Sequence, residues 1–116
     1  MKAAVKLQDV LTNGDKSLSR QLTLFALINL GMIDSLANGL LSTSNALRIF
    51  YTADNCLFVR KQLRDKTADR VMSHGVQLPD LFDVLTPEEA HREFQHELSA
   101  MRALCLKLLE DKRLVA

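Results

Sequence analysis

The residues with the clearest potential for chemistry are two Glu-x-x-His pairs in the C-terminal third of the chain. Glu88 precedes His91 by three positions, and Glu93 precedes His96 by the same spacing. On a helix this spacing lets one carboxylate and one imidazole reach the same metal ion, as in di-iron helical bundles. The second pair is offset by five residues, which turns it about 140° from the first, so the two pairs cannot share a site within one chain.

A helical reading of this region also separates the two histidines. It places His91 about 60° from an apolar seam and His96 about 160° from it. We therefore expect His96 on the solvated face and His91 at the edge of the core. Glu88 and Glu93 lie near the start of the helix, where carboxylates interact favourably with the helix dipole. Glu88 and His91 remain weak candidate metal ligands, and we predict no metal and no cofactor.

The two thiols, Cys56 and Cys105, are the candidate nucleophiles, with His74 and His91 as conceivable bases. Both cysteines lie among apolar residues, whereas a reactive cysteine needs a lowered thiol pKa and access to solvent. The sequence also has no glycine-rich phosphate loop, Cys-x-x-Cys pair or Gly-x-Ser-x-Gly elbow. We predict no catalytic residues, and the sequence favours a protein that is not an enzyme.

A cluster of basic residues offers a different chemistry, contact with phosphate groups. Its members are Arg60, Lys61, Arg64, Lys66 and Arg70. Aspartates within the same stretch dilute the cluster, and a net charge of +1 gives no strong field that would attract nucleic acid. A small nucleic-acid-binding regulator that uses Arg60, Lys61, Arg64 and Arg70 is therefore the alternative function.

The elements that must position these residues are helices. The chain of 116 residues contains 22 Leu and 11 Ala against 7 Val and 3 Ile. Leu and Ala favour helices, and the residues that suit a sheet are scarce. We predict an all-α protein, a compact bundle of four to five helices that forms a single domain over residues 1–116.

Apolar spacing and capping signals place these helices along the chain. We predict a short helix over residues 3–12, a central helix over residues 17–38 that stops at Gly39, and a last helix over residues 86–112. Thr86, Pro87 and Glu89 form a capping box at the start of the last helix. Residues 77–85 are expected to be one short connector turn between the last two long helices.

Residues 45–73 allow two interpretations. Residues 47–51 and 56–59 hold most of the β-favouring side chains and could pair as a hairpin. The apolar spacing instead favours a helix that is interrupted near Asn55 and stops at His74 and Gly75.

The last helix carries more apolar surface than its seam needs. The seam repeats at steps of four and three through Phe94, Leu98, Met101, Cys105 and Leu108. Leu104, Leu106 and Leu109 extend beyond it, and Asn29 lies inside the wide apolar arc of the central helix. Asn29 could pair with its symmetry mate, although a partner within the chain is the favoured reading.

These surplus apolar side chains point to assembly. We predict a non-enzymatic protein-interaction module that acts as a homodimer through Leu104, Leu106, Leu109 and Asn29, or that offers this face to another protein. The chain has no apolar stretch of about 20 residues and no secretory h-region, so we expect a cytoplasmic protein without a membrane partner.

Overall fold

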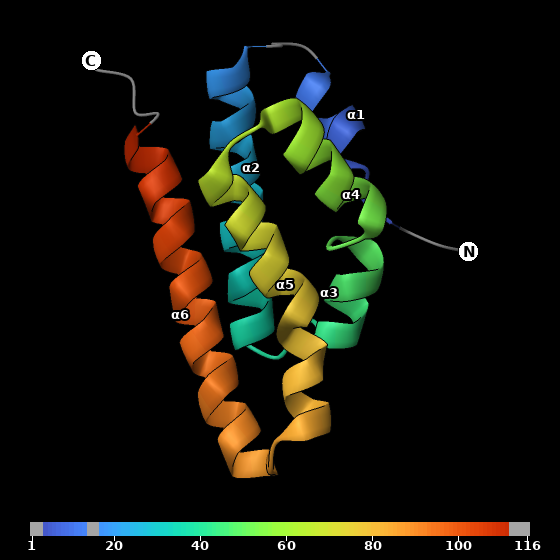
Figure 1. Cartoon of the computed structure of the whole chain (residues 1–116), viewed down its shortest axis with the longest axis vertical. Coiled ribbons are helices and arrows are strands. Elements are labelled where there is room, and N and C mark those ends of the chain that lie inside the picture. The colour runs from blue at the N-terminus through green and yellow to red at the C-terminus, as the bar shows by residue number, and fades with distance from the viewer. Residues whose placement is uncertain (1–3, 14–16, 112–116) are drawn as a thin grey trace.

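The part of the chain that the computed structural model describes, residues 4–13 and 17–111, is built from helices without strands. This confirms the predicted all-α fold. Six α-helices and one π-helical turn form in these residues (Figure 1): α1 (Leu7–Thr12), α2 (Leu18–Ala37), α3 (Thr43–Ile49), α4 (Ala53–Phe58), η1 (Val59–Leu63), α5 (Lys66–Val84) and α6 (Pro87–Asp111).

Three long helices form the body of the molecule. Helices α5 and α6 run antiparallel as a hairpin, and α2 packs against α6 (Figure 1). Helix α2 also contacts α1, α3, α5 and η1, so it is the central helix. The shorter helices α1, α3 and α4 lie on the side of the molecule away from α6. Among the described residues, no helix has both the length and the apolarity to cross a membrane.

Local signals define the ends of α2 as predicted. The Ser17 hydroxyl accepts a hydrogen bond from the backbone N–H of Arg20 at 3.3 Å, which caps the first turn. At the other end, Gly39 has a φ of +72°, a left-handed conformation that costs glycine little. The side chain of Leu40, which follows Gly39, is 80% exposed.

The predicted capping box and seam of α6 are both confirmed. Thr86 Oγ1 accepts from the N–H of Glu89, and the Glu89 carboxylate accepts from the N–H of Thr86, each at 3.3 Å. The seam faces the core, because all of its residues are buried: Phe94, Leu98, Met101, Cys105 and Leu108.

The hairpin alternative for residues 45–73 is wrong, and the expected interruption near Asn55 is present at residues 50–52. Asn55 lies inside α4, and the chain breaks before it, between α3 and α4. The buried Asn55 amide holds that break by donating to the carbonyls of Val5 (2.8 Å) and Phe50 (2.7 Å), and it accepts from the N–H of Leu7 (3.0 Å). One side chain therefore ties α1 to the junction of α3 and α4.

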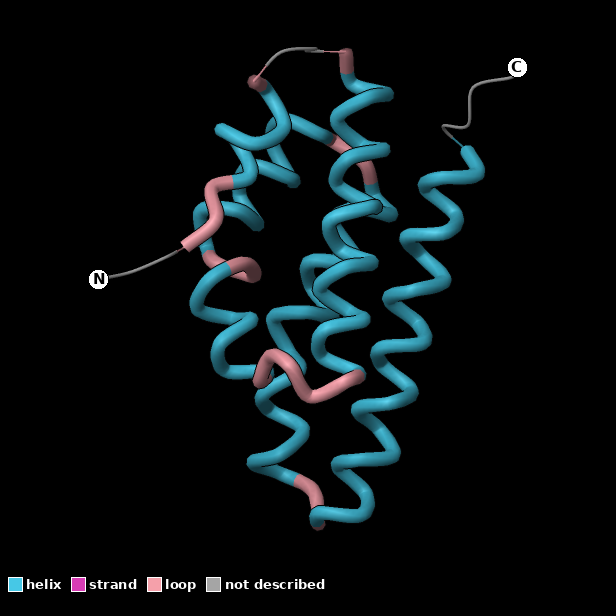
Figure 2. The backbone as a smooth tube through the Cα atoms, turned by 180° about the vertical axis from the view of Figure 1, so that it is seen from behind, coloured by secondary structure: helices cyan, strands magenta, loops and turns pink. Residues whose placement is uncertain are grey.

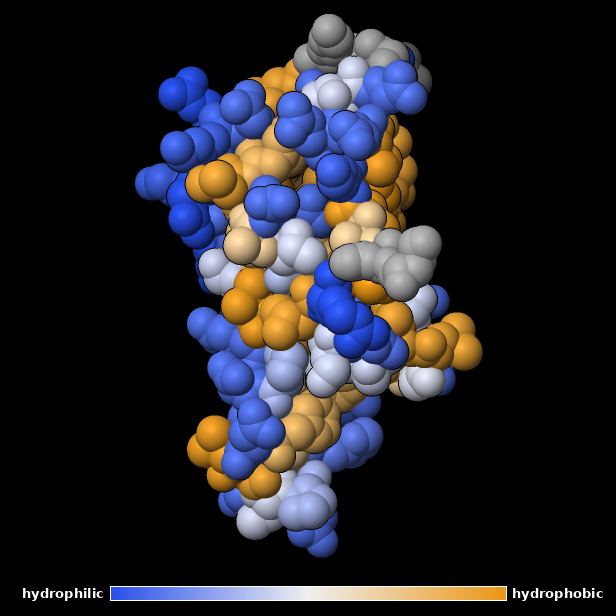
Figure 3. Space-filling view, turned by 90° about the vertical axis from the view of Figure 1, so that its right-hand side faces the viewer, coloured by the Kyte–Doolittle hydropathy of each residue, from blue (hydrophilic) through white to orange (hydrophobic). Residues whose placement is uncertain are grey.

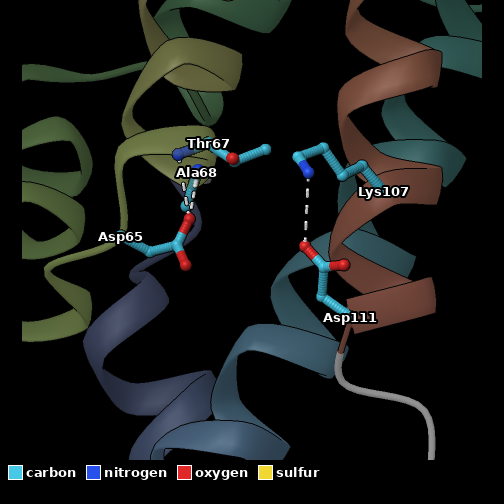
Figure 4. A network of polar contacts seen from close by, with 5 residues as sticks. All are labelled: Asp65, Thr67, Ala68, Lys107 and Asp111. Carbon is cyan, nitrogen blue, oxygen red and sulfur yellow. Dashed lines mark hydrogen bonds and ion pairs between the residues drawn. The ribbon is translucent and has the colours of Figure 1, made fainter.

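A second break separates η1 from α5. Arg64 adopts a left-handed backbone conformation with a φ of 51°. The Asp65 carboxylate then accepts from the N–H groups of Thr67 (2.9 Å) and Ala68 (3.0 Å), which caps α5 (Figure 4). The same view shows an ion pair between Lys107 and Asp111 in the last turn of α6.

Gly75 does not end a helix, and residues 77–85 are not a connector turn. Helix α5 continues through Gly75 and Pro79 to Val84, and only Leu85 and Thr86 connect it to α6. The glycine is there for packing: a Cβ atom at position 75 would overlap the ring of Tyr51. Gly75 therefore allows the buried tyrosine to lie against the backbone of α5.

The two glycines in helix interiors provide a test of this packing. We expect Gly75→Ala to lower the free energy of unfolding by about 1–3 kcal/mol, because the new methyl group overpacks against Tyr51. Gly31→Ala is the matched control, since a Cβ there meets no atom within 4 Å and alanine favours the helix by up to ~1 kcal/mol. Urea unfolding at low protein concentration measures both. Equal effects would contradict the proposed packing role.

Candidate functional site

The described residues leave one side of α2 uncovered. Its exposed positions are Arg20, Leu24, Leu27, Gly31 and Asp34, which we call the α2 stripe. Leu24 is 43% exposed and Leu27 is 50% exposed. Because positions three and four apart share a helix face, these five residues lie along one side of α2. An apolar centre between two charged ends makes the stripe a candidate surface for contact with another molecule.

The opposite side of α2 packs in the core. Its buried residues are Gln21, Leu22, Phe25, Ala26, Asn29, Ile33 and Leu36. The wide apolar arc that the sequence shows is therefore shared between two environments, the core and the open side. Figure 2 shows α2 from behind, lying beside α6.

Helix α6 borders the α2 stripe. The Arg102 guanidinium lies 3.7 Å from the carboxylate of Asp34. Leu106 follows Arg102 by one helical turn on the same side of α6 and is 51% exposed. Leu104 and Leu109, the other α6 leucines predicted for interaction, are partly buried and pack against the core. Leu106 therefore extends the apolar surface next to the stripe.

Asn29, the fourth residue predicted for interaction, uses its amide inside the chain. Its Oδ1 atom accepts from the Tyr51 hydroxyl at 3.0 Å, and its Nδ2 donates to the Phe25 carbonyl at 3.0 Å. Both Asn29 and Tyr51 are fully buried. The Asn29 amide therefore has its partners within the chain, as expected, and does not need a symmetry-related Asn29. Burial, with smaller contributions from the nearby Cys105 and Cys56, raises the pKa of Tyr51 far above its ordinary value.

A groove of about 640 Å³ lies between α3, α4 and α5. Its lining combines Tyr51, Cys56 and Met72 with a pair of charges, Arg60 and Asp69. The Nε atom of Arg60 lies 3.6 Å from Oδ1 of Asp69, and this oxygen is buried without a hydrogen bond. The volume suits a small amphipathic molecule. The face that carries α3 and α4 shows hydrophobic patches between hydrophilic side chains (Figure 3).

The thiols in the structure are poor nucleophiles. Burial raises the pKa of Cys56, and the nearby Arg60 opposes this only in part. Burial raises the pKa of Cys105 to about 12. Both cysteines are free, and both hold their protons at neutral pH because thiolate formation is disfavoured. The groove therefore has no activated cysteine with which to begin covalent chemistry.

The predicted basic cluster does not lie on one helix. Arg60 and Lys61 belong to η1, Arg64 occupies the left-handed turn, and Arg70 belongs to α5. All four side chains are exposed. Arg60 is already paired with Asp69, which lowers the positive charge available to a phosphate group.

The weak metal candidates, Glu88 and His91, are both exposed in the first turns of α6. Within residues 4–13 and 17–111, no three His, Cys, Asp or Glu side chains gather in a group that could hold a metal ion. The structure therefore brings no third ligand to Glu88 and His91 within its described part.

Sequence reasoning missed one contact between the two long C-terminal helices. Nδ1 of His74 in α5 lies 2.5 Å from Oε1 of Glu97 in α6, and both side chains are about three-quarters buried. The two residues are 23 positions apart in sequence, so no local sequence pattern predicts that they pair. The contact helps to align α5 with α6 rather than forming a site open to substrate.

Comparison with known proteins gives one match. A family model described as "Protein of unknown function (DUF3969)" matches residues 16–115. No curated protein and no solved structure matches the chain.

The Tyr51–Asn29 contact predicts how the protein responds to alkali. The folded chain holds the Tyr51 proton more tightly than the unfolded chain, so this stabilisation is complete below the ordinary pKa of 10.0 and is lost as pH rises above it. Tyr51 is the single tyrosine of the chain, so tyrosinate absorbance reports on it alone. We expect that absorbance to appear together with the loss of helical circular dichroism. Ionisation near pH 10 with the helices intact would contradict the buried contact.

Proposed function

We propose that this chain, which belongs to the DUF3969 family, acts as a non-enzymatic assembly module. In this proposal it forms a homodimer whose interface is the α2 stripe together with Leu106. The observation that carries the proposal is the exposure of Leu24, Leu27 and Leu106 on neighbouring parts of α2 and α6. A contiguous apolar patch at the surface of a small protein is typical of a contact site.

The size of the apolar contribution is consistent with a reversible dimer. Covering a half-exposed leucine contributes roughly 1 kcal/mol, so six of them from two chains contribute about 6 kcal/mol. The loss of translational and rotational freedom on association costs about the same at the lower end of its range. The polar contacts along the stripe therefore decide how tight and how specific the dimer is.

A second copy is the preferred partner because twofold assemblies are the commonest soluble oligomers. The absence of activated thiols supports a role without covalent chemistry. We place the protein in the cytoplasm, because a reducing compartment suits the free Cys56 and Cys105.

Nucleic-acid binding is the second candidate function. The exposure of Arg60, Lys61, Arg64 and Arg70 supports it, and the pairing of Arg60 with Asp69 weakens it. This candidate predicts retention on immobilised DNA or RNA at low salt, with release as the salt concentration rises. The homodimer proposal predicts that the protein passes through unretained.

Sedimentation velocity tests the homodimer directly. We expect the wild-type chain to sediment as a dimer at micromolar concentration and Leu27→Asp to sediment as a monomer with unchanged circular dichroism, because a carboxylate in the apolar centre loses its hydration on contact. Leu57→Asp is the matched control, since Leu57 is 48% exposed on α4 and should leave the dimer intact.

Two results would overturn the proposal. One is a wild-type chain that stays monomeric up to a concentration of several hundred micromolar. The other is an equal response to Leu27→Asp and Leu57→Asp, which would mean that the α2 side has no special role.

A further inference from the structure

We infer that the groove between α3, α4 and α5 binds a small neutral molecule that carries an amide head on an apolar chain. The head lies between Arg60 and Asp69, and the chain extends along α5 toward Gln77. The groove shares no residue with the α2 stripe or Leu106, so this inference is independent of the proposed homodimer. Three features support it: the shape of the groove, its apolar floor and the hydrogen bonding of Asp69.

One wall of the groove is a single face of α5. Its residues are Asp69, Met72, Ser73, Val76 and Gln77. They follow one another at steps of three and one, which is the spacing of one helix face, and they extend over about two turns, or ~12 Å. The ion pair between Asp69 and Arg60 places both charges at the same end of this wall, which we call the charged end. The groove therefore has the shape of an elongated molecule with a polar head.

The floor of the groove is apolar and fixed in position. Tyr51 and Met72 line the groove, and both are fully buried. The Tyr51 ring lies against the backbone of α5 at Gly75, and its hydroxyl donates to Asn29. Because this hydroxyl is bonded inside the core, it is not available to a ligand. A preformed apolar floor of this kind suits the chain of an amphipathic molecule.

Asp69 has hydrogen-bonding capacity that the chain does not use. Among the described side chains, its Oδ1 atom is buried and has no hydrogen-bond partner. The Nε atom of Arg60, at 3.6 Å, is beyond hydrogen-bond distance. The Asp69 side chain is 37% exposed and lines the groove, and rotation about its last bond exchanges its two oxygens. The carboxylate can therefore accept a hydrogen bond from a donor that enters the groove.

The charges at this end select a neutral head. Arg60 compensates the charge of Asp69 without satisfying its hydrogen bonding, so neither a cation nor an anion finds an unpaired opposite charge here. An amide offers an N–H to the carboxylate and, beside it, a carbonyl oxygen to the guanidinium. Arg60 is 62% exposed, and an exposed ion pair of this kind contributes little, so its side chain can shift to admit the head.

Cys56 adds no charge to the charged end. Burial raises the pKa of its thiol, Arg60 lowers it and Asp69 raises it, so the thiol lies near both members of the ion pair. The raised pKa keeps the thiol protonated at neutral pH. Cys56 therefore gives the head a neutral, polarisable neighbour.

Three probes that share one chain and differ in the head test the inference: octanamide is neutral, octanoate is anionic and octylammonium is cationic. We expect the wild-type chain to bind octanamide with a dissociation constant of about 0.1–1 mM. It should bind the two charged probes about tenfold more weakly, because they lose hydration without gaining an unpaired partner. Calorimetry measures the affinities. Tyr51 is the single tyrosine and the chain has no tryptophan, so tyrosine fluorescence reports occupancy of the groove.

Substitutions at the charged end should change the preferred head in opposite directions. Asp69→Ala leaves Arg60 without its partner, so octanoate should become the preferred probe. Arg60→Ala leaves Asp69 without its partner, so octylammonium should become the preferred probe. Asp83→Ala is the matched control, because Asp83 is an exposed aspartate of α5 outside the groove, and this variant should still prefer octanamide. Added salt should reduce the two new preferences.

Ser73→Phe tests the location. Ser73 is exposed on the α5 wall, so the new ring should fill the groove and abolish octanamide binding with unchanged circular dichroism and melting temperature. Octanamide binding that survives Ser73→Phe would place the site elsewhere and overturn the inference.

Three further results would overturn it. One is a wild-type chain that binds no probe at millimolar concentration. Another is equal binding of all three probes that neither Asp69→Ala nor Arg60→Ala changes, which would mean that only the chain is recognised. The third is a wild-type preference for octanoate, which would move the head to Arg48, the groove residue of α3 whose guanidinium donates to Asn45.

Discussion

The contact between Tyr51 and the backbone of α5 is the constraint on which the arrangement of this protein depends. The tyrosine ring lies where a side chain at Gly75 would be, and its hydroxyl reaches Asn29 in the middle of α2. One residue thereby fixes the junction of α3 and α4 against two of the three long helices. Helix α6 then packs against both α2 and α5. Since the core side of α2 is used in this way, only its other side remains for contact with a second molecule.

The local features of the fold were predictable from sequence because their causes are local. The capping box at Thr86 and the stop at Gly39 involve residues within a few positions of one another, and the α6 seam repeats along a single helix. The roles of Gly75 and Asn55 are not local. The sequence pattern predicts a helix end at Gly75, whereas the glycine makes room for the Tyr51 ring, 24 positions away in sequence. The pattern predicts the break near Asn55, but not that the Asn55 amide holds it by donating to the carbonyls of Val5 and Phe50.

The sequence pattern predicts surplus apolar surface, but not where that surface lies. Surplus leucine on α6 and a wide apolar arc on α2 predict a second contact, and of the α6 leucines beyond the seam only Leu106 is exposed. Leu104 and Leu109 are partly buried and Asn29 is satisfied within the chain, because neighbouring helices cover positions that a single helical wheel cannot assign. The same limitation hid the α2 stripe. Which side of a central helix stays open depends on every helix packed around it.

Helix α2 therefore has two roles in this account: its buried side holds the chain together, and its open side holds a second copy. Dipolar coupling between spin labels would test this account most directly, with Cys56 replaced and the label attached at position 31 of the α2 stripe. Docking through the stripe predicts a short separation between the labels of the two chains, because position 31 lies only four residues of helix, about 6 Å, from Leu27. No coupling between two labels at position 31 would contradict the account.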